Sequence, residues 1–152
     1  MLYKTHLALG ILAILLFLPR VHAQITFVLV ALLATLLPDI DQGYSKLGHR
    51  KIFRPLQFFV RHRGMMHSFT VCFLIALVLA YFPLTVTWAL PFFLGYGIHL
   101  FADAFTLEGI QPFWPYQGVS KGFLKTGSYT EKSFFIFLVV LDLFVAVLVF
   151  MK

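Results

Sequence analysis

The chain has 152 residues, of which 61% are hydrophobic and 12% are charged, and its mean hydropathy is +0.91. A small soluble core cannot bury that much apolar surface, so the composition excludes a soluble globular protein and indicates one integral membrane domain over residues 1–152. The net charge is +6, but the sequence predicts no folded basic face that would bind nucleic acid. Cys72 is the one cysteine of the chain, which excludes an intrachain disulfide.

Apolar runs, taken in chain order, predict five helical segments near residues 5–18, 22–37, 68–82, 85–107 and 133–151. Only the last two approach the roughly 20 residues that cross a bilayer upright. The first two are short, so they either span a thinned membrane or form a hairpin that does not fully span. Pro19, Pro38 and Pro83 support the predicted boundaries, and Pro91 is expected to kink the fourth segment. We therefore expect an all-α polytopic membrane bundle with about four to five transmembrane helices.

The first 23 residues also fit a secretory signal. Lys4 precedes an apolar stretch, and residues 21–23 resemble a small-residue cleavage site. Cleavage there would remove His6 from the mature protein. Arg20 argues against cleavage, because it lies where an uncharged stretch is expected before such a site.

The basic residues predict the orientation of the chain. If all five segments span, the N-terminus and the loops 38–67 and 108–132 share one side of the membrane. That side carries ten of the twelve lysines and arginines, namely Lys4, Lys46, Arg50, Lys51, Arg54, Arg61, Arg63, Lys121, Lys125 and Lys132. The positive-inside rule makes this side cytoplasmic. Histidines and aspartates gather on the same side, so we expect them to form one surface there.

The most specific local pattern is His99 followed by Asp103 in the fourth segment. Residues four apart lie on one helix face, and Gly95 continues that face without a side chain to block close approach. An imidazole and a carboxylate at this spacing can hold one zinc or manganese ion, and the second carboxylate oxygen can bind another. A hydrogen bond between the two side chains within the bundle is the structural alternative.

Two further clusters lie at segment ends. Asp39 and Asp41 follow Pro38, where carboxylates oppose the helix dipole and call for a compensating cation. A solvated Asp-x-Asp turn is the simpler alternative for this pair. His67 falls in the first turn of the third segment, where its ring can point toward the interface of His99. Together these side chains predict a divalent metal site.

His62 and Arg63 precede the third segment and are the predicted catalytic residues. His62 can be a ligand, an acid that protonates a leaving group, or a residue that orients a ligand. Arg63 is interpreted as a binder of an anionic group, because Gly64 after it lets the backbone fold tightly. An ordinary membrane-flanking arginine is the alternative.

Two acids near the C-terminus have structural interpretations. Glu131 completes a capping box that begins at Ser128. Asp142 lies among Val, Leu and Phe in the middle of the last segment, so it is expected to face the bundle and to have a polar partner.

Five ordered motifs resemble the YdjM-like family of membrane-bound metal-dependent hydrolases, some of them LexA-regulated. The motifs are LPDID (37–41), LGHR (47–50), HRGMMHS (62–68), GYGIHLFAD (95–103) and TLEGI (106–110) with Trp114-Pro115. The resemblance implies a bacterial inner membrane protein with several spans. It also implies distant similarity to zinc-dependent phospholipase C, a helical enzyme that cleaves phosphoesters with two or three zinc ions.

The resemblance implies a ligand set made of His6, one of Asp39 and Asp41, His67, His99, and Asp103 as the bridge between ions. Met66 and Gln42 depart from the family pattern, and the histidines of a third zinc site have no counterpart after Asp103. Two ions, Zn²⁺ or Mn²⁺, are therefore expected.

The expected function is hydrolysis of phospholipid head groups by a metal-activated water, either as a phosphatase or as a phospholipase C-like enzyme. The partner is a membrane lipid substrate, and the sequence does not predict the oligomeric state. Two alternatives stay open. One is a non-catalytic protein with a structural metal, whose ligands would close the coordination sphere. The other is a metal transporter, whose ligands should lie near the midplane rather than at one face.

Overall fold

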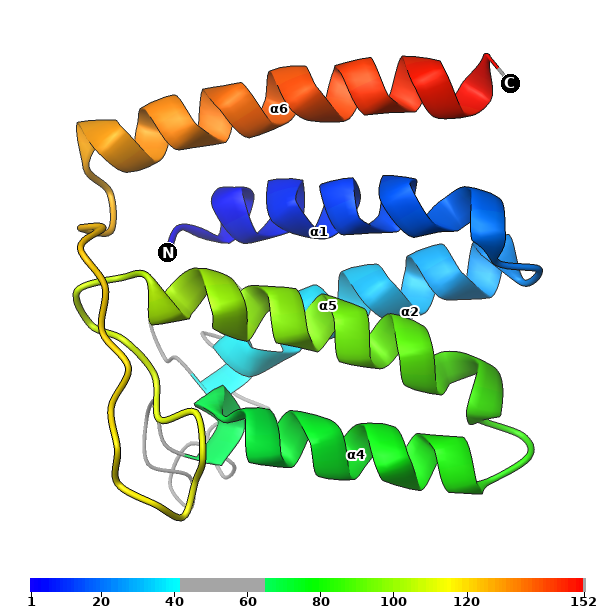
Figure 1. Ribbon diagram of the computed structural model, residues 1–152, viewed down its shortest axis with the longest axis horizontal. Coiled ribbons are helices and arrows are strands. Elements are labelled where there is room, and N and C mark those ends of the chain that lie inside the picture. The colour runs from blue at the N-terminus through cyan, green and yellow to red at the C-terminus, as the bar shows by residue number, and fades with distance from the viewer. Residues whose placement is uncertain (42–64, 152) are drawn as a thin grey trace.

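The computed structural model describes residues 1–41 and 65–151, with the backbone alone at Ile40 and Asp41. Its helices are α1 (Tyr3–Phe17), η1 (Leu18–Arg20), α2 (Gln24–Leu36), η2 (Leu37–Asp41), η4 (Met65–His67), α4 (Phe69–Tyr81), α5 (Val86–Ala104) and α6 (Tyr129–Phe150). Figure 1 shows them as a bundle in which the N-terminus, the ends of α2 and α5, and the starts of α4 and α6 gather at one end. The predicted all-α class is confirmed for the described residues.

Prolines terminate helices where the sequence predicted. Pro19 and Pro38 each lie in a 3₁₀ turn directly after α1 or α2, and Pro83 follows α4. Phe82, which precedes Pro83, is extended, as a residue before proline prefers, and α4 ends there. Leu18 and Leu37 keep the α conformation before Pro19 and Pro38, and the chain there tightens into a 3₁₀ turn. Pro91, by contrast, lies inside α5, and the helix continues through it.

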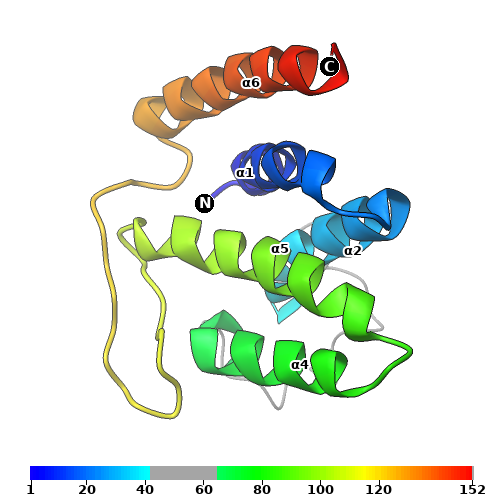
Figure 2. The same ribbon diagram turned by 45° about the vertical axis from the view of Figure 1, so that its right-hand side comes forward.

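Helix α5 occupies the middle of the bundle. It packs against α1, α2 and α4, whereas α6 packs against α1, as the turned view in Figure 2 also shows. The contact between α2 and α5 is backbone to backbone, because a Cβ atom added at Gly95 would lie 2.2 Å from the Ala31 carbonyl oxygen. The close approach predicted at Gly95 is therefore confirmed.

Two described stretches are long and apolar enough to cross a membrane, Tyr3–Arg20 and Tyr129–Phe150. Helix α2 with the turn after it, and helix α4, are apolar but shorter. At 1.5 Å per residue, the 13 residues of α4 extend about 20 Å, less than the ~30 Å hydrocarbon core. The total of four to five spans thus stays a prediction.

Candidate metal centre

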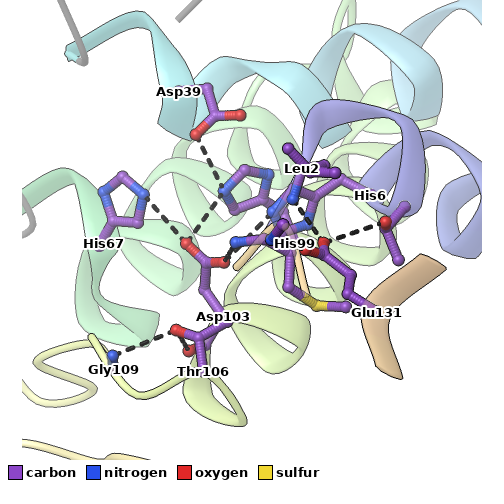
Figure 3. A network of polar contacts seen from close by, with 12 residues as sticks. Leu2, His6, Asp39, His67, His99, Asp103, Thr106, Gly109 and Glu131 are labelled. Carbon is purple, nitrogen blue, oxygen red and sulfur yellow. Dashed lines mark hydrogen bonds and ion pairs between the residues drawn. The ribbon is translucent and has the colours of Figure 1, made fainter. Parts of the chain in front are cut away.

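Five side chains from four helical elements meet at the end of the bundle where the N-terminus lies. His6 comes from α1, Asp39 from η2, His67 from η4, and His99 and Asp103 from the last turns of α5. All are buried, and the most accessible of them, Asp39, is only 7% exposed. Figure 3 shows the three imidazoles and two carboxylates pointing toward one another. Side chains 97 positions apart in the chain thus form one polar cluster.

The contact between α2 and α5 determines how His99 is oriented. His99 lies one turn beyond Gly95, and Thr35 lies one turn beyond Ala31, so the close helix contact continues into this pair. The His99 Nδ1 atom lies 2.8 Å from the Thr35 carbonyl oxygen. Because a carbonyl only accepts, Nδ1 donates, and in the neutral ring the lone pair is therefore on Nε2. This nitrogen points into the cluster as a metal ligand would.

Asp103 is the centre of the cluster. Its Oδ1 atom accepts a hydrogen bond from the amino group of Met1 and lies 3.2 Å from His6 Nε2. Its Oδ2 atom lies 3.8 Å from His67 Nε2 and 3.9 Å from His99 Nε2. The two oxygens thus face different imidazoles, as the sequence predicted for a bridging carboxylate.

Asp39 approaches the cluster from the opposite side of His99. Its Oδ1 atom lies 3.7 Å from His99 Nε2. The rings of His6 and His99 stack with centroids 3.8 Å apart and an interplanar angle of 10°. Stacked rings at this distance would repel each other if both were protonated, so the packing favours a neutral, ligand-competent state for at least one of them.

The spacing of the donor atoms fits a metal ion. Two overlapping groups, His6–Asp39–His99 and His67–His99–Asp103, each keep their ligand atoms within 4.8 Å of one another. With bonds of 2.0–2.2 Å, ligands of one tetrahedral zinc lie about 3.3 Å apart, close to the 3.2–3.9 Å separations found here. In the described part of the chain, His99 Nε2 and His6 Nδ1 are buried without a hydrogen bond. Buried donors and acceptors normally have partners, so this arrangement suits an ion.

The structure brings together five of the six predicted metal ligands. The sixth, Asp41, ends η2, but its side chain lies outside the described residues. The predicted catalytic residues His62 and Arg63 also lie outside the described residues, so both remain predictions.

Glu131 supports the site from α6 and makes more contacts than a capping residue needs. The Ser128 half of the predicted capping box is confirmed, because the Ser128 hydroxyl accepts a hydrogen bond from the Glu131 amide at 3.3 Å. The return bond is not made, because the Ser128 amide donates to the Lys125 carbonyl oxygen. The buried Glu131 carboxylate also accepts bonds from the Leu2 amide at 2.6 Å, the Thr5 hydroxyl at 3.1 Å and the Gly127 amide at 2.6 Å. These bonds tie the start of α6 to the segment that carries His6.

Asp142 faces the bundle as predicted, but far from the cluster along α6. It lies in a cavity of about 460 Å³ between α1 and α6, which Lys4 also lines. The Asp142 Oδ1 atom makes no hydrogen bond with any residue that the structure describes. The polar partner expected from the sequence is therefore not found among those residues.

Comparison with known proteins establishes the family. The family described as YdjM inner membrane protein matches residues 1–151. The chain belongs to this family. It is 37% identical over 93 residues to the inner membrane protein YdjM of Escherichia coli (strain K12) and, equally, to that of Shigella flexneri. Each match covers 56% of this chain and 47% of the relative, so the chain spans about half the length of the curated relatives it matches.

Membership in the YdjM family confirms the resemblance seen in the motifs and the inner membrane location. No solved structure matches the chain. The likeness to zinc-dependent phospholipase C stays a prediction.

Proposed function

We propose that this protein is a membrane-bound metal-dependent phosphoesterase that acts on phospholipid head groups and binds two divalent cations, Zn²⁺ or Mn²⁺. The observation that carries the proposal is the buried cluster of three imidazoles and two carboxylates, whose atoms are spaced as around a metal ion. Ionisable groups are rare in membrane proteins, where they usually mark function. Neither the family name nor the relatives' names state an activity, so the chemistry is argued from the cluster alone.

The two candidate ligand groups overlap at His99, which could belong to only one of two ions. His99 offers Nε2 alone, because Thr35 occupies its other nitrogen, so it can serve one ion. Asp103 presents Oδ1 toward His6 and Oδ2 toward His67 and His99. Asp103 is thus the side chain best placed to join two ions.

When bound, a divalent cation brings the pKa of a coordinated water toward ~7 and offsets the charge of a phosphate. The chain supplies the rest of the chemistry. The Thr35 carbonyl keeps the His99 ring in one tautomer and orientation, and burial of the cluster excludes bulk water. We propose that His62 protonates the leaving group and that Arg63 holds phosphate oxygens.

We also propose that the five α-helices of the described residues lie in the membrane, with the cluster at the cytoplasmic face. Large apolar side chains are exposed on the shorter helices as well as on the two candidate spans, as in Ile25, Leu29 and Leu33 of α2 or Phe73, Leu74 and Leu77 of α4. A reporter fused after Lys152 should then read as extracytoplasmic, and one inserted near Lys121 as cytoplasmic. The opposite pattern would reverse the leaflet that supplies substrate.

A structural metal site is the second candidate, and the burial of the cluster favours it. His6, His67, His99 and Asp103 are each 0% exposed. A coordination sphere completed by protein atoms leaves no position for a reacting water.

Metal analysis combined with a hydrolysis screen separates the two candidates. Purified protein should contain about two equivalents of zinc or manganese and should release phosphate or a phosphorylated head group from a common phospholipid. His62→Ala should keep most of the metal while lowering turnover by ~10²-fold, the typical contribution of one proton-transfer group. His99→Ala should lose metal and activity together. Fully loaded wild-type protein that hydrolyses no phospholipid would make the metal structural.

A further inference from the structure

An apolar groove runs along the seam between α1 and α5. One cavity of about 390 Å³ and a second of about 360 Å³ share the lining residues Leu9, Ile98 and Phe101, so they are neighbours. Every residue lining either cavity is apolar or glycine. We call this combined cavity the α1–α5 groove.

The groove ends at the metal-binding cluster. Met1 and Ala102 line its second cavity. The amino group of Met1 contacts Asp103, and Ala102 directly precedes Asp103 in α5. A molecule lying in the groove would thus have one end beside the cluster.

The length of the groove suits one hydrocarbon chain. Its lining extends along the first helix from Met1 to Phe17, roughly 24 Å at the 1.5 Å rise of a helix. That is about the length of one extended long acyl chain and shorter than the ~30 Å hydrocarbon core. A soluble head group would leave all this apolar surface uncovered.

Two basic residues lie close in sequence to residues that line the second cavity. Phe123 and Leu124 line the second cavity, and the exposed Lys121 and Lys125 flank them in the chain. This charge suits an anionic phosphate at the head of the hydrocarbon chain. The cavity between α1 and α6 differs, because it contains Asp142, whose carboxylate would be costly to cover with hydrocarbon.

We propose that the α1–α5 groove seats one hydrocarbon chain of a lipid phosphate ester and thereby delivers the ester to the cluster. The inference rests on the proposed function and narrows its substrates to long-chain lipids. The hydrocarbon chain of the lipid does not react, but its binding energy then positions the phosphate that reacts.

A larger side chain at Gly97 is the substitution chosen to fill the groove. It lines the first cavity, and a Cβ atom added there would have nothing within 4 Å. The Cβ atom of a leucine at this position would therefore meet no protein atom, and leucine favours the helix more than glycine does. Ala80→Leu is the matched control, because Ala80 is exposed on α4 and lines neither cavity.

The experiment compares long-chain and short-chain forms of one phospholipid that wild-type protein hydrolyses. Gly97→Leu should lower kcat/KM for the long-chain lipid by ~10-fold or more, the effect of losing contacts to about two methylene groups. It should leave the dihexanoyl form and the metal content unchanged, and Ala80→Leu should change neither lipid. An equal loss on both lipids, or no loss, would overturn the groove while leaving the proposed function intact.

Photolabelling tests the groove without relying on activity. A phosphatidic acid with a diazirine in its acyl chain should label peptides of α1 and α5 in wild-type protein, and Gly97→Leu should suppress that labelling. Labelling spread evenly over the outward faces of α4 and α6 would overturn the groove. If wild-type protein hydrolyses no lipid, the proposed function fails, and the labelling result alone decides whether the groove binds a chain.

Discussion

Helices α5 and α6 differ in their hydropathy and in how far other helices surround them. Helix α6 has 22 residues with a mean hydropathy of 2.9 in its best window, and only 11% of that window is buried in the protein. Helix α5 carries His99, Asp103 and Pro91 and is not among the candidate spans, yet it lies in the middle of the bundle. The helix with the higher hydropathy is thus the less buried one, whereas two of the candidate metal ligands lie on the helix that other helices surround.

The aspartates of the two helices also differ in the contacts that they make. Asp103 of α5 has an amino group and three imidazoles within 4 Å. Asp142 of α6 has an oxygen with no hydrogen bond to a described residue. We therefore expect α5 to respond strongly to small changes and α6 to respond weakly, apart from its first turn.

The largest effect is expected at Asp103. Asp103→Asn removes the negative charge that faces three imidazoles, so purified protein should lose more than one of the two proposed metal equivalents. Turnover of phospholipid should fall by ~10³-fold or more, because metal and water activation are lost together. Elemental analysis and a hydrolysis assay measure the two results. Full metal content in this variant would contradict the bridging role.

Gly95→Ala tests the packing of α5 against α2. The added Cβ atom would lie 2.2 Å from the Ala31 carbonyl oxygen, so the helices must separate. We expect a loss of about 3 kcal/mol in the free energy of unfolding, at the upper end of overpacking effects. The His99–Thr35 hydrogen bond should weaken with it, which lowers metal affinity. Gly97→Ala is the matched control, since its Cβ atom meets open space, and a similar loss there would contradict the explanation.

Glu131→Ala tests the comparison at the buried acid in the first turn of α6. Three donors, Leu2, Thr5 and Gly127, lose a charged acceptor, which should cost about 2 kcal/mol in thermal or denaturant unfolding. Metal affinity should fall modestly, because the segment that carries His6 is less well held. Glu131→Gln should restore part of the stability. Equal stability of the alanine variant and wild type would show that these bonds contribute nothing net.

The smallest effect is expected at Asp142. Asp142→Asn keeps the shape of the side chain and removes a carboxylate that has no described partner for Oδ1. Stability should change by no more than about 0.5 kcal/mol, and metal content should not change. Loss of metal in this variant would show that α6 is coupled to the cluster and would break the contrast with α5.

Which side chains share the site was predictable from the sequence, whereas the contacts made by backbone atoms were not. The i, i+4 spacing of His99 and Asp103, with Gly95 one turn earlier, correctly predicted one helix face packed closely against a neighbour. The Thr35 carbonyl that orients His99 gives no sequence signal, because every residue has a carbonyl. The contact between Asp39 and His99 likewise depends on the 3₁₀ geometry of η2.

Membrane topology was the less predictable part of the fold. Proline positions gave the helix ends, since proline acts locally. The number of spans depends on how lipid and protein divide each helix surface, which neither length nor composition determines for the 13 residues of α4.

The order of the ligands along the chain has a consequence for biogenesis. Synthesis runs from the N-terminus, so His6, Asp39 and His67 emerge before His99 and Asp103. The shared imidazole and the central carboxylate both arrive with α5, and until α5 packs beside α1 and α2 the earlier ligands have no common centre. A nascent chain that stops before His99 therefore lacks both ligand groups, and a metal bound by the complete cluster would stabilise only the assembled bundle. Metal loading would then act as a late checkpoint on correct insertion.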